Sequence, residues 1–226
     1  MFFNLKKRGK AVKEKLEKIK QFFNKNIRWI LVILCLVIFC FILEDVLDKE
    51  IEQFDNIIYT WLSNIIKEPI TTFAKIVTTM GAGYTIIPIC IISVIYFWKK
   101  KEANYIVVNL ITIFFSNQLL KRIVERPRPE GFRIVEELGY SFPSGHSMVS
   151  MAFYGLFIYF IYKKVKNKYI KWTSIILLSL LIALIGISRV YLGVHYASDV
   201  LAGFLLSISY LGLFTHIIKN SFSDAS

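Results

Sequence analysis

The chain has 226 residues, 55% hydrophobic and 19% charged, and 28 Lys and Arg against 16 Asp and Glu give it a formal net charge of +12. Such a high hydrophobic fraction excludes an intrinsically disordered chain. A soluble nucleic-acid-binding domain is also excluded, because long stretches carry no charge at all, so we expect no nucleic acid as a partner. The length suits one domain, and the apolar stretches predict a membrane protein.

The three cysteines predict neither a disulfide framework nor a metal site. Cys35, Cys40 and Cys90 all lie inside apolar stretches, and three are too few for the framework of a small secreted domain. The sequence also lacks the Cys and His spacing of a zinc site. We therefore expect no metal and no cofactor.

Six stretches are candidates for crossing a bilayer as helices, which takes about 20 residues each. The expected spans are residues 27–43, 70–98, 103–120, 147–162, 172–187 and 196–218. The fourth and fifth are short, so a re-entrant or interfacial segment is the alternative for each of these two. The predicted fold class is all-α: a polytopic membrane protein with six transmembrane helices.

The residues before the first span are strongly basic, with ten Lys and Arg in residues 1–28. This segment is too long for the n-region of a signal peptide, and no small-residue cleavage site follows the span. Apolar residues recur at helical spacing over residues 5–25, which predicts a basic amphipathic helix on an anionic membrane surface. A solvated basic tail that only determines the topology is the alternative.

The distribution of Lys and Arg among the loops predicts the orientation. Six spans place both termini on the same side of the membrane as the loops near 99–102 and 163–171. The segments on this side hold 19 Lys and Arg, whereas the loops on the other side hold 8. Cytoplasmic loops carry the excess of these residues, so we expect a multi-pass protein of the cytoplasmic membrane with both termini in the cytoplasm. The predicted organisation is a cytoplasmic segment 1–28, a six-helix domain 29–219 and a tail 220–226.

The segment after the first span has its own helical pattern. Its apolar positions over residues 51–66 fall on one helical face, which predicts an amphipathic helix on the outer surface. Such a helix either simply joins two spans or covers a site beneath it.

The remaining polar residues concentrate in three short segments, at residues 121–129, 142–147 and 188–199. Between His146 and His195 there is room for one span in and one span back, so all three segments reach the same face of the membrane, the outer one. Charged side chains near the hydrocarbon are costly, so a cluster of them marks a functional site.

The cations and the helix start in these segments suit a phosphate group. Lys121, Arg128 and Arg189 provide three positive charges for a phosphate dianion. Ser144 and Gly145 stand where a helix begins, and the free N–H groups of a helix start bind anions. Three cations also supply the charge neutralisation for which other phosphoryl-transfer sites use Mg²⁺.

Two histidines and an aspartate suit nucleophilic catalysis. The four-residue spacing of His195 and Asp199 places a carboxylate beside one imidazole nitrogen and leaves the other free to act as a nucleophile. His146 is a second imidazole, placed to donate a proton to a leaving oxygen.

Three motifs follow one another over residues 121–199: Lys-x₆-Arg-Pro, Pro-Ser-Gly-His and Ser-Arg-x₅-His-x₃-Asp. In this order they resemble the three signatures of the type-2 phosphatidic acid phosphatase (PAP2) superfamily, and every defining position is present. The likeness is to its bacterial membrane lipid phosphatases, which act on phosphatidylglycerophosphate or undecaprenyl pyrophosphate. It implies that His195 forms a phosphohistidine, that Asp199 orients it, and that His146 is the general acid and then the base. It also implies that the phosphate oxygens are held by Lys121, Arg128, Ser144, Gly145 and Arg189.

The expected protein is thus an integral membrane phosphatase that hydrolyses, without metal, a lipid phosphomonoester or pyrophosphate: phosphatidylglycerophosphate, phosphatidic acid or undecaprenyl pyrophosphate. Its expected partners are this lipid and the bilayer, with no obligate protein partner. A lipid-to-lipid phosphotransferase using the same site is the alternative, whereas nearly charge-free spans without repeats disfavour a transporter. Arg122, Arg126 and Arg133 match no position of the motifs and are interpreted as headgroup or surface charges.

Overall fold

The computed structural model of the chain describes residues 2–131 and 133–219, with side chains from residue 16 onward except at 19 and 24. Over these residues the chain forms eight α-helices and no strand, which confirms the all-α prediction. The helices are α1 (Phe2–Leu47), α2 (Glu52–Ser63), α3 (Glu68–Thr79), α4 (Gly83–Tyr96), α5 (Lys101–Val124), α6 (Gly145–Lys164), α7 (Lys168–Tyr191) and α8 (Ala197–Lys219).

Four helices are each long and apolar enough to cross a membrane: the Lys25–Leu47 part of α1, α5, α7 and α8. The predicted second span, residues 70–98, is not one helix but two, because α3 and α4 are separated by a short break and bent by 45°. Together this pair makes a fifth candidate span. The chain is therefore a multi-pass membrane protein.

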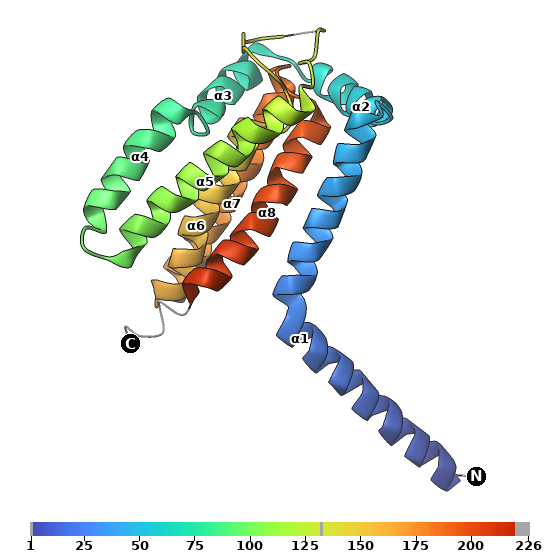
Figure 1. Cartoon of the computed structure of the whole chain (residues 1–226). Helices are drawn as coiled ribbons and strands as arrows, with labels where there is room; N and C mark the ends of the chain where they lie inside the picture. The colour runs from blue at the N-terminus through green and yellow to red at the C-terminus, as the bar shows by residue number, and fades with distance from the viewer. Residues whose placement is uncertain (1, 132, 220–226) are drawn as a thin grey trace.

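The predicted span at residues 147–162 lies in α6, which does not meet the same test of length and composition. α6 contacts α5, α7 and α8, so protein surrounds much of it (Figure 1). Its Ser147 and Ser150 are fully buried, and Ser150 Oγ donates to Ser147 O at 3.3 Å. A helix enclosed by other helices needs a smaller apolar surface than one that faces lipid, so α6 can carry such polar residues within the bundle.

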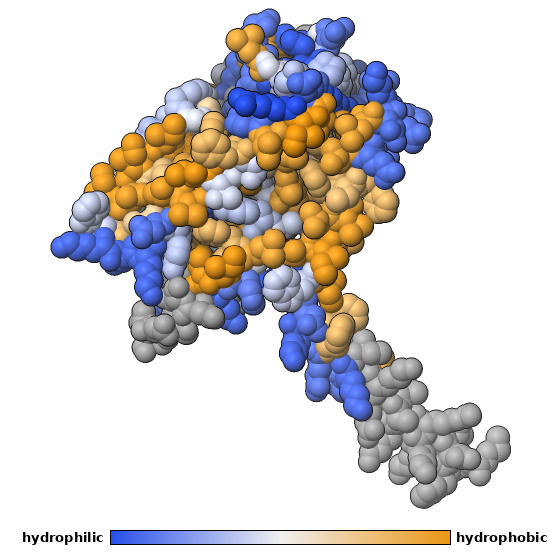
Figure 2. Space-filling view, in the orientation of Figure 1, coloured by the Kyte–Doolittle hydropathy of each residue, from blue (hydrophilic) through white to orange (hydrophobic). Residues whose placement is uncertain are grey.

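On the face that Figure 2 shows, an apolar band covers the middle of the bundle, between a hydrophilic cap and a hydrophilic opposite end. Large apolar side chains of the long helices are exposed, among them Phe115 of α5, Leu177 of α7 and Leu213 of α8. Such an extensive exposed apolar surface is unfavourable in water and favourable in lipid, so the band is the membrane-facing surface.

The cap lies at the end of the bundle where α2, the loop 125–144 and the junction of α7 with α8 come together, and the beginning of α1 lies far from it (Figure 1). The predicted basic helix over residues 5–25 is the first part of α1, and it leaves the bundle at an angle. The predicted amphipathic helix over residues 51–66 is α2, which packs against α7 and α8.

The close packing of α8 on the start of α6 gives the first prediction. A Cβ at Gly203 would lie 3.1 Å from the carbonyl oxygen of Ser144 and 3.2 Å from Ser147 Cβ. Because a backbone oxygen cannot rotate away, Gly203→Val should lower the free energy of unfolding by about 1–3 kcal/mol, measured by unfolding in detergent. Gly83→Val is the control, since a Cβ there meets no atom within 4 Å. Equal losses in both variants would contradict the tight contact at Gly203.

Candidate active site

The three segments that carry the motifs meet at the capped end of the bundle. Ser144 N, at the start of α6, donates to Asp199 O in the first turn of α8 at 3.1 Å. Arg128 Nη1, in the loop after α5, donates to Val194 O just before α8 at 2.9 Å. The end of α5, the start of α6 and the start of α8 are thus joined directly.

His195 is 1% exposed and lies beside Asp199, which is fully buried. The four-residue spacing is not that of one continuous helix, because α8 begins only at Ala197. The contact forms nevertheless: His195 Nδ1 is 3.3 Å from Asp199 Oδ2, and Tyr196 N donates to the same oxygen at 2.9 Å.

The neighbours of His195 determine which ring nitrogen carries the proton. Arg128 Nη1 lies 3.2 Å from His195 Nε2, and because a guanidinium can only donate, Nε2 accepts. The proton is therefore assigned to Nδ1, which donates to Asp199. Burial, followed by the charges of Arg189 and Arg128, holds the pKa of His195 well below its ordinary value of 6.5. The imidazole is neutral at pH 7, with an unprotonated Nε2.

Arg189 is a buried cation of this site, with 2% of its surface exposed. Its Nη1 donates to Thr78 Oγ1 in α3 at 2.7 Å, and its Nη2 forms an ion pair with Glu137. Its Nε has no hydrogen-bond acceptor within the part of the chain that the structure describes. The guanidinium therefore retains a donor for a ligand.

Arg128 and Lys121 complete the group of cations. Arg128 is 7% exposed, and its Nε and Nη2 donate to two carbonyl oxygens of the loop before α6, each at 3.0 Å. Lys121 Nζ donates to Tyr140 O in the same loop at 2.5 Å. The charges of both residues contribute to the low pKa of His195, so the predicted cations gather around this ring.

The start of α6 has the predicted helix cap. Ser144 Oγ accepts from a backbone N–H one turn further along at 3.4 Å. Gly145 approaches α5 closely, since a Cβ there would lie 3.1 Å from Asn117 Oδ1. His146 follows in the first turn, and the turn between α3 and α4 packs on it at Gly81, where a Cβ would lie 3.1 Å from His146 Cδ2.

Glu137 also belongs to this site, although none of the motifs includes it. Its Oε2 is 3.1 Å from Arg128 Nη1 and 4.0 Å from His195 Nε2, and its Oε1 pairs with Arg189. Burial raises the pKa of Glu137, but the nearby cations, Arg189 first, outweigh burial and hold this pKa at about 2. The sequence offers no signal for this residue, because it lies in a loop without periodicity.

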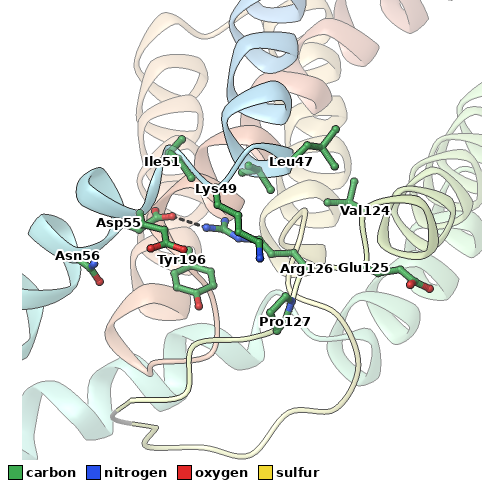
Figure 3. A pocket seen from close by; sticks show the side chains of 12 residues that line it. Leu47, Lys49, Ile51, Asp55, Asn56, Val124, Glu125, Arg126, Pro127 and Tyr196 are labelled. Atoms are coloured by element: carbon green, nitrogen blue, oxygen red, sulfur yellow. Dashed lines mark hydrogen bonds and ion pairs between the residues drawn. The ribbon is translucent and has the colours of Figure 1, made fainter.

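Arg126 lies inside the protein, and its interpretation as a headgroup or surface charge is wrong. Its side chain is 11% exposed, and it donates to Asp55 Oδ2 through Nη2 and to Asp199 Oδ1 through Nη1, both at 2.7 Å. Its guanidinium also lies 4.0 Å from the centre of the Tyr196 ring. Figure 3 shows Arg126, Asp55 and Tyr196 facing one another.

Asp55 connects α2 to this network. It is 1% exposed, its Oδ1 accepts from Ser198 N at 2.8 Å, and its Oδ2 accepts from Ser198 Oγ at 2.6 Å. Ser198 N is one of the N–H groups that the first turn of α8 leaves without an intrahelical partner, so Asp55 caps α8 from a different helix. The sequence could not predict this pair, whose members are 143 residues apart.

Two cavities adjoin the network. The larger, of about 490 Å³, lies between the end of α1, α2 and the loop after α5, and Arg126 and Tyr196 line it (Figure 3). The smaller, of about 170 Å³, reaches His195 between α2 and the loop, where Tyr59 and Gly131 line it. Of these two cavities, the smaller is the one that His195 lines.

The side chains around His195 suit an anion. In the described residues, no three His, Cys, Asp or Glu side chains are grouped so that they could hold a metal ion. Arg128 instead lies 3.2 Å from His195 Nε2, and Arg189 and Lys121 are near enough for their charges to lower the pKa of this ring. Arginine and lysine donors bind phosphate or carboxylate oxygens.

Removing the charge of Arg126 should destabilise the protein. In Arg126→Gln, Asp55 and Asp199 stay buried but lose the cation between them, at a cost of about 3–5 kcal/mol in the free energy of unfolding. Thermal unfolding in detergent measures this cost. Arg122→Gln makes the same change at an exposed arginine and should stay within about 0.5 kcal/mol of the parent chain. Two equally stable variants would show that the ion pairs of Arg126 contribute nothing.

The low pKa of His195 predicts how stability depends on pH. The folded-state pKa lies below the ordinary 6.5, so between these two values the unfolded chain binds a proton that the folded chain does not. This contribution to stability is therefore complete above about pH 6.5 and is lost as the pH falls below it. Unfolding at about pH 7.5 and about pH 5.5 should show a larger loss for the parent chain than for His195→Gln. The same loss in both would contradict a neutral, buried His195.

The chain is similar to known proteins over the part that carries the three motif segments. Residues 102–223 match the family model described as the PAP2 superfamily. Over 137 residues the chain is 36% identical to phosphatidylglycerophosphatase B of Bacillus subtilis (strain 168), a match that covers 58% of this chain and 67% of that protein. Over 203 residues it is 26% identical to the undecaprenyl-diphosphatase of Sulfolobus acidocaldarius, covering 84% of this chain and 91% of that protein.

The fold is also that of a solved PAP2 structure. The crystal structure of the first transmembrane PAP2 type phosphatidylglycerolphosphate phosphatase from Bacillus subtilis superimposes with a TM-score of 0.76 at 26% sequence identity, covering 86% of this chain and 97% of that chain. The family match includes all three motif segments and more than half of the sequence. The chain therefore belongs to the PAP2 superfamily.

Proposed function

We propose that the chain is an integral membrane lipid phosphatase that hydrolyses a lipid phosphomonoester or pyrophosphate through a phosphohistidine intermediate, without a metal. The geometry of His195 carries this proposal: its Nδ1 faces buried Asp199, and its unprotonated Nε2 faces Arg128. A nucleophile needs such a lone pair next to the cations that hold the phosphate. Similarity to phosphatidylglycerophosphatase B and to an undecaprenyl-diphosphatase supports the substrate class.

In the first step, His195 Nε2 attacks phosphorus opposite the leaving oxygen. The N–P bond forms as the P–O bond to the leaving group breaks. His146 donates a proton to the departing oxygen, and the lipid leaves as an alcohol or, from a pyrophosphate, as a monophosphate. Arg128, Arg189 and Lys121 stabilise the negative charge on the phosphoryl oxygens.

In the second step, water attacks the phosphohistidine, His146 accepts a proton from this water, and the N–P bond breaks to release inorganic phosphate. While it is phosphorylated, His195 carries a positive charge, which the Asp199 carboxylate stabilises through Nδ1. The hydroxyl of Ser144 and the N–H of Gly145, at the start of α6, donate to phosphate oxygens in both steps.

The position of the site supports a lipid substrate. The cap that holds the three motif segments directly borders the apolar band of the bundle (Figure 2). A phosphate in the site would therefore remain at the membrane boundary while the hydrocarbon chains of the same molecule stay in the bilayer. The candidate substrates are phosphatidylglycerophosphate, phosphatidic acid and undecaprenyl pyrophosphate.

We extend the proposal to the topology. α6, enclosed by α5, α7 and α8, is the sixth span beside the four long helices and the α3–α4 pair. The distribution of Lys and Arg supports cytoplasmic termini and a site on the outer face of the cytoplasmic membrane. The proposed organisation is an N-terminal segment 1–28, a phosphatase domain 29–219 and a tail 220–226, which lies outside the described residues.

The test is phosphate release by the purified protein in detergent with excess EDTA. The panel contains the three candidate lipids and a soluble sugar phosphate, and we expect release from at least one lipid to exceed release from the sugar phosphate. His195→Ala should lower turnover by roughly 10³-fold or more, because the nucleophile is lost. His216→Ala, at the far end of α8, is the matched control and should retain turnover.

Each part of the proposal has a contrary outcome. Turnover that EDTA abolishes would contradict metal-free catalysis, and an active His195→Ala would contradict the phosphohistidine. A folded protein that releases no phosphate from any lipid would contradict a hydrolase. Transfer of labelled phosphate to the hydroxyl of a second lipid would then identify the phosphotransferase alternative.

A further inference from the structure

The carboxylate of Glu137 lies where the proposed mechanism needs the phosphate. Its Oε2 is 4.0 Å from His195 Nε2, the atom that would attack phosphorus, and 3.1 Å from Arg128 Nη1. Its Oε1 forms an ion pair with Arg189. The two arginines that would bind phosphate oxygens bind carboxylate oxygens instead. Glu137 in this conformation and a substrate phosphate therefore exclude each other.

The carboxylate is firmly held in its charged form. Burial raises the pKa of Glu137, but the nearby cations, Arg189 first, outweigh burial and keep this pKa at about 2. The side chain is an anion at any physiological pH, and arginine–carboxylate pairs are among the strong hydrogen bonds of proteins. A ligand must therefore compete with an ionised carboxylate for Arg128 and Arg189.

The side chain can leave the site without moving a helix. It is 27% exposed and belongs to the loop 125–144, in which no helix or strand is found among the described residues. Arg128 binds two backbone carbonyl oxygens directly after Glu137, at Leu138 and Gly139. These bonds can persist while the Glu137 side chain rotates toward solvent, so the loop backbone does not have to move with it.

We propose that Glu137 is an internal competitor of the substrate: an anion that every ligand must displace from Arg128 and Arg189. This inference rests on the proposed function of the site. A phosphomonoester carries a charge of about −1.5 to −2 at neutral pH, more than the single charge of Glu137. A phosphodiester carries one negative charge and gains no electrostatic advantage from the exchange.

Competition between Glu137 and the ligand matters because a cationic site at a membrane surface also attracts headgroups that are not its substrate. Phosphodiester headgroups surround such a site, and clustered arginine and lysine side chains attract them. With Glu137 present, a diester replaces one monovalent anion by another, whereas a monoester or a terminal pyrophosphate group adds charge. Both ligands meet the same cost of displacing Glu137, and the diester, which has less charge, is left with little net affinity for the site.

Glu137→Gln tests the inference, because it removes the charge and nearly preserves the shape. Glu136→Gln is the matched control, since it makes the same change at the preceding residue, which is exposed. The first readout is the dissociation constant of inorganic phosphate, measured by thermal stabilisation of the purified protein in detergent, which requires no turnover. Glu137→Gln should bind phosphate at least about tenfold more tightly than the parent chain. Glu136→Gln should bind it like the parent chain.

The second readout is inhibition by a diester. Phosphatidylglycerol added to the micelles should inhibit phosphatidic acid hydrolysis by Glu137→Gln at a mole fraction at least about tenfold lower than for the parent chain. The KM for phosphatidic acid in micelles without added diester should fall in the same variant. A structural role of Glu137 alone would instead lower stability and turnover without strengthening the binding of any anion.

Unchanged or weaker phosphate binding by folded Glu137→Gln would overturn the inference, and so would equal inhibition of variant and parent chain by phosphatidylglycerol. Glu137→Ala carries the same expectations and replaces the Gln variant if that variant does not unfold cooperatively. Tighter phosphate binding by Glu137→Gln in a protein that hydrolyses no lipid would support the competition and overturn the proposed function. Failure of the two proposals is thus distinguishable.

Discussion

The carboxylate of Asp199 is fully buried, and the arrangement of the site follows from the need to neutralise it. A charge removed from water costs several kcal/mol unless cations and hydrogen-bond donors surround it. Arg126 satisfies one oxygen, and His195 Nδ1 and Tyr196 N satisfy the other. Arg126 comes from the loop after α5 and the other two from the start of α8, so one carboxylate both orients His195 and holds these two segments together.

The same network makes α2 a wall of the site. Asp55 binds Arg126 and caps α8 at Ser198, and it is almost completely buried. Moving α2 away would leave this carboxylate without its partners and would expose the first turn of α8, at a cost comparable to breaking a buried ion pair. The sequence leaves two roles open for α2: it either only connects two spans or covers the site beneath it. The structure favours a fixed wall, and access to His195 then depends on the loop opposite.

Sequence reasoning succeeded where the signal is local. The four-residue spacing of His195 and Asp199, the helix start at Ser144 and the long apolar stretches all act within a few turns of helix. It failed where partners are distant or irregular: Arg126 and Asp55 are 71 residues apart, and Glu137 lies in a loop whose course no periodicity encodes. The span over residues 70–98 was predicted from hydropathy, which detects the contact of a helix with lipid and not a break in it. Gly81, Gly83 and Pro88 within this stretch do indicate close packing or a kink, and the break indeed lies between α3 and α4, where Gly81 packs against His146.

A cluster of cations must be assembled by folding before any substrate phosphate can bind to it. Like charges as close as those of Arg128 and Arg189 repel each other, and the repulsion grows where little water screens it. Glu137 bridges both guanidinium groups and offsets this repulsion, so their orientation is set in advance. A phosphate that replaces the carboxylate finds arginines already in place, and the necessary rearrangement is confined to one loop side chain. The contact that stabilises the cationic cluster also weakens its affinity for every anion, and only a ligand with more charge recovers the difference. The stability of the site and its affinity for anions therefore depend on the same carboxylate.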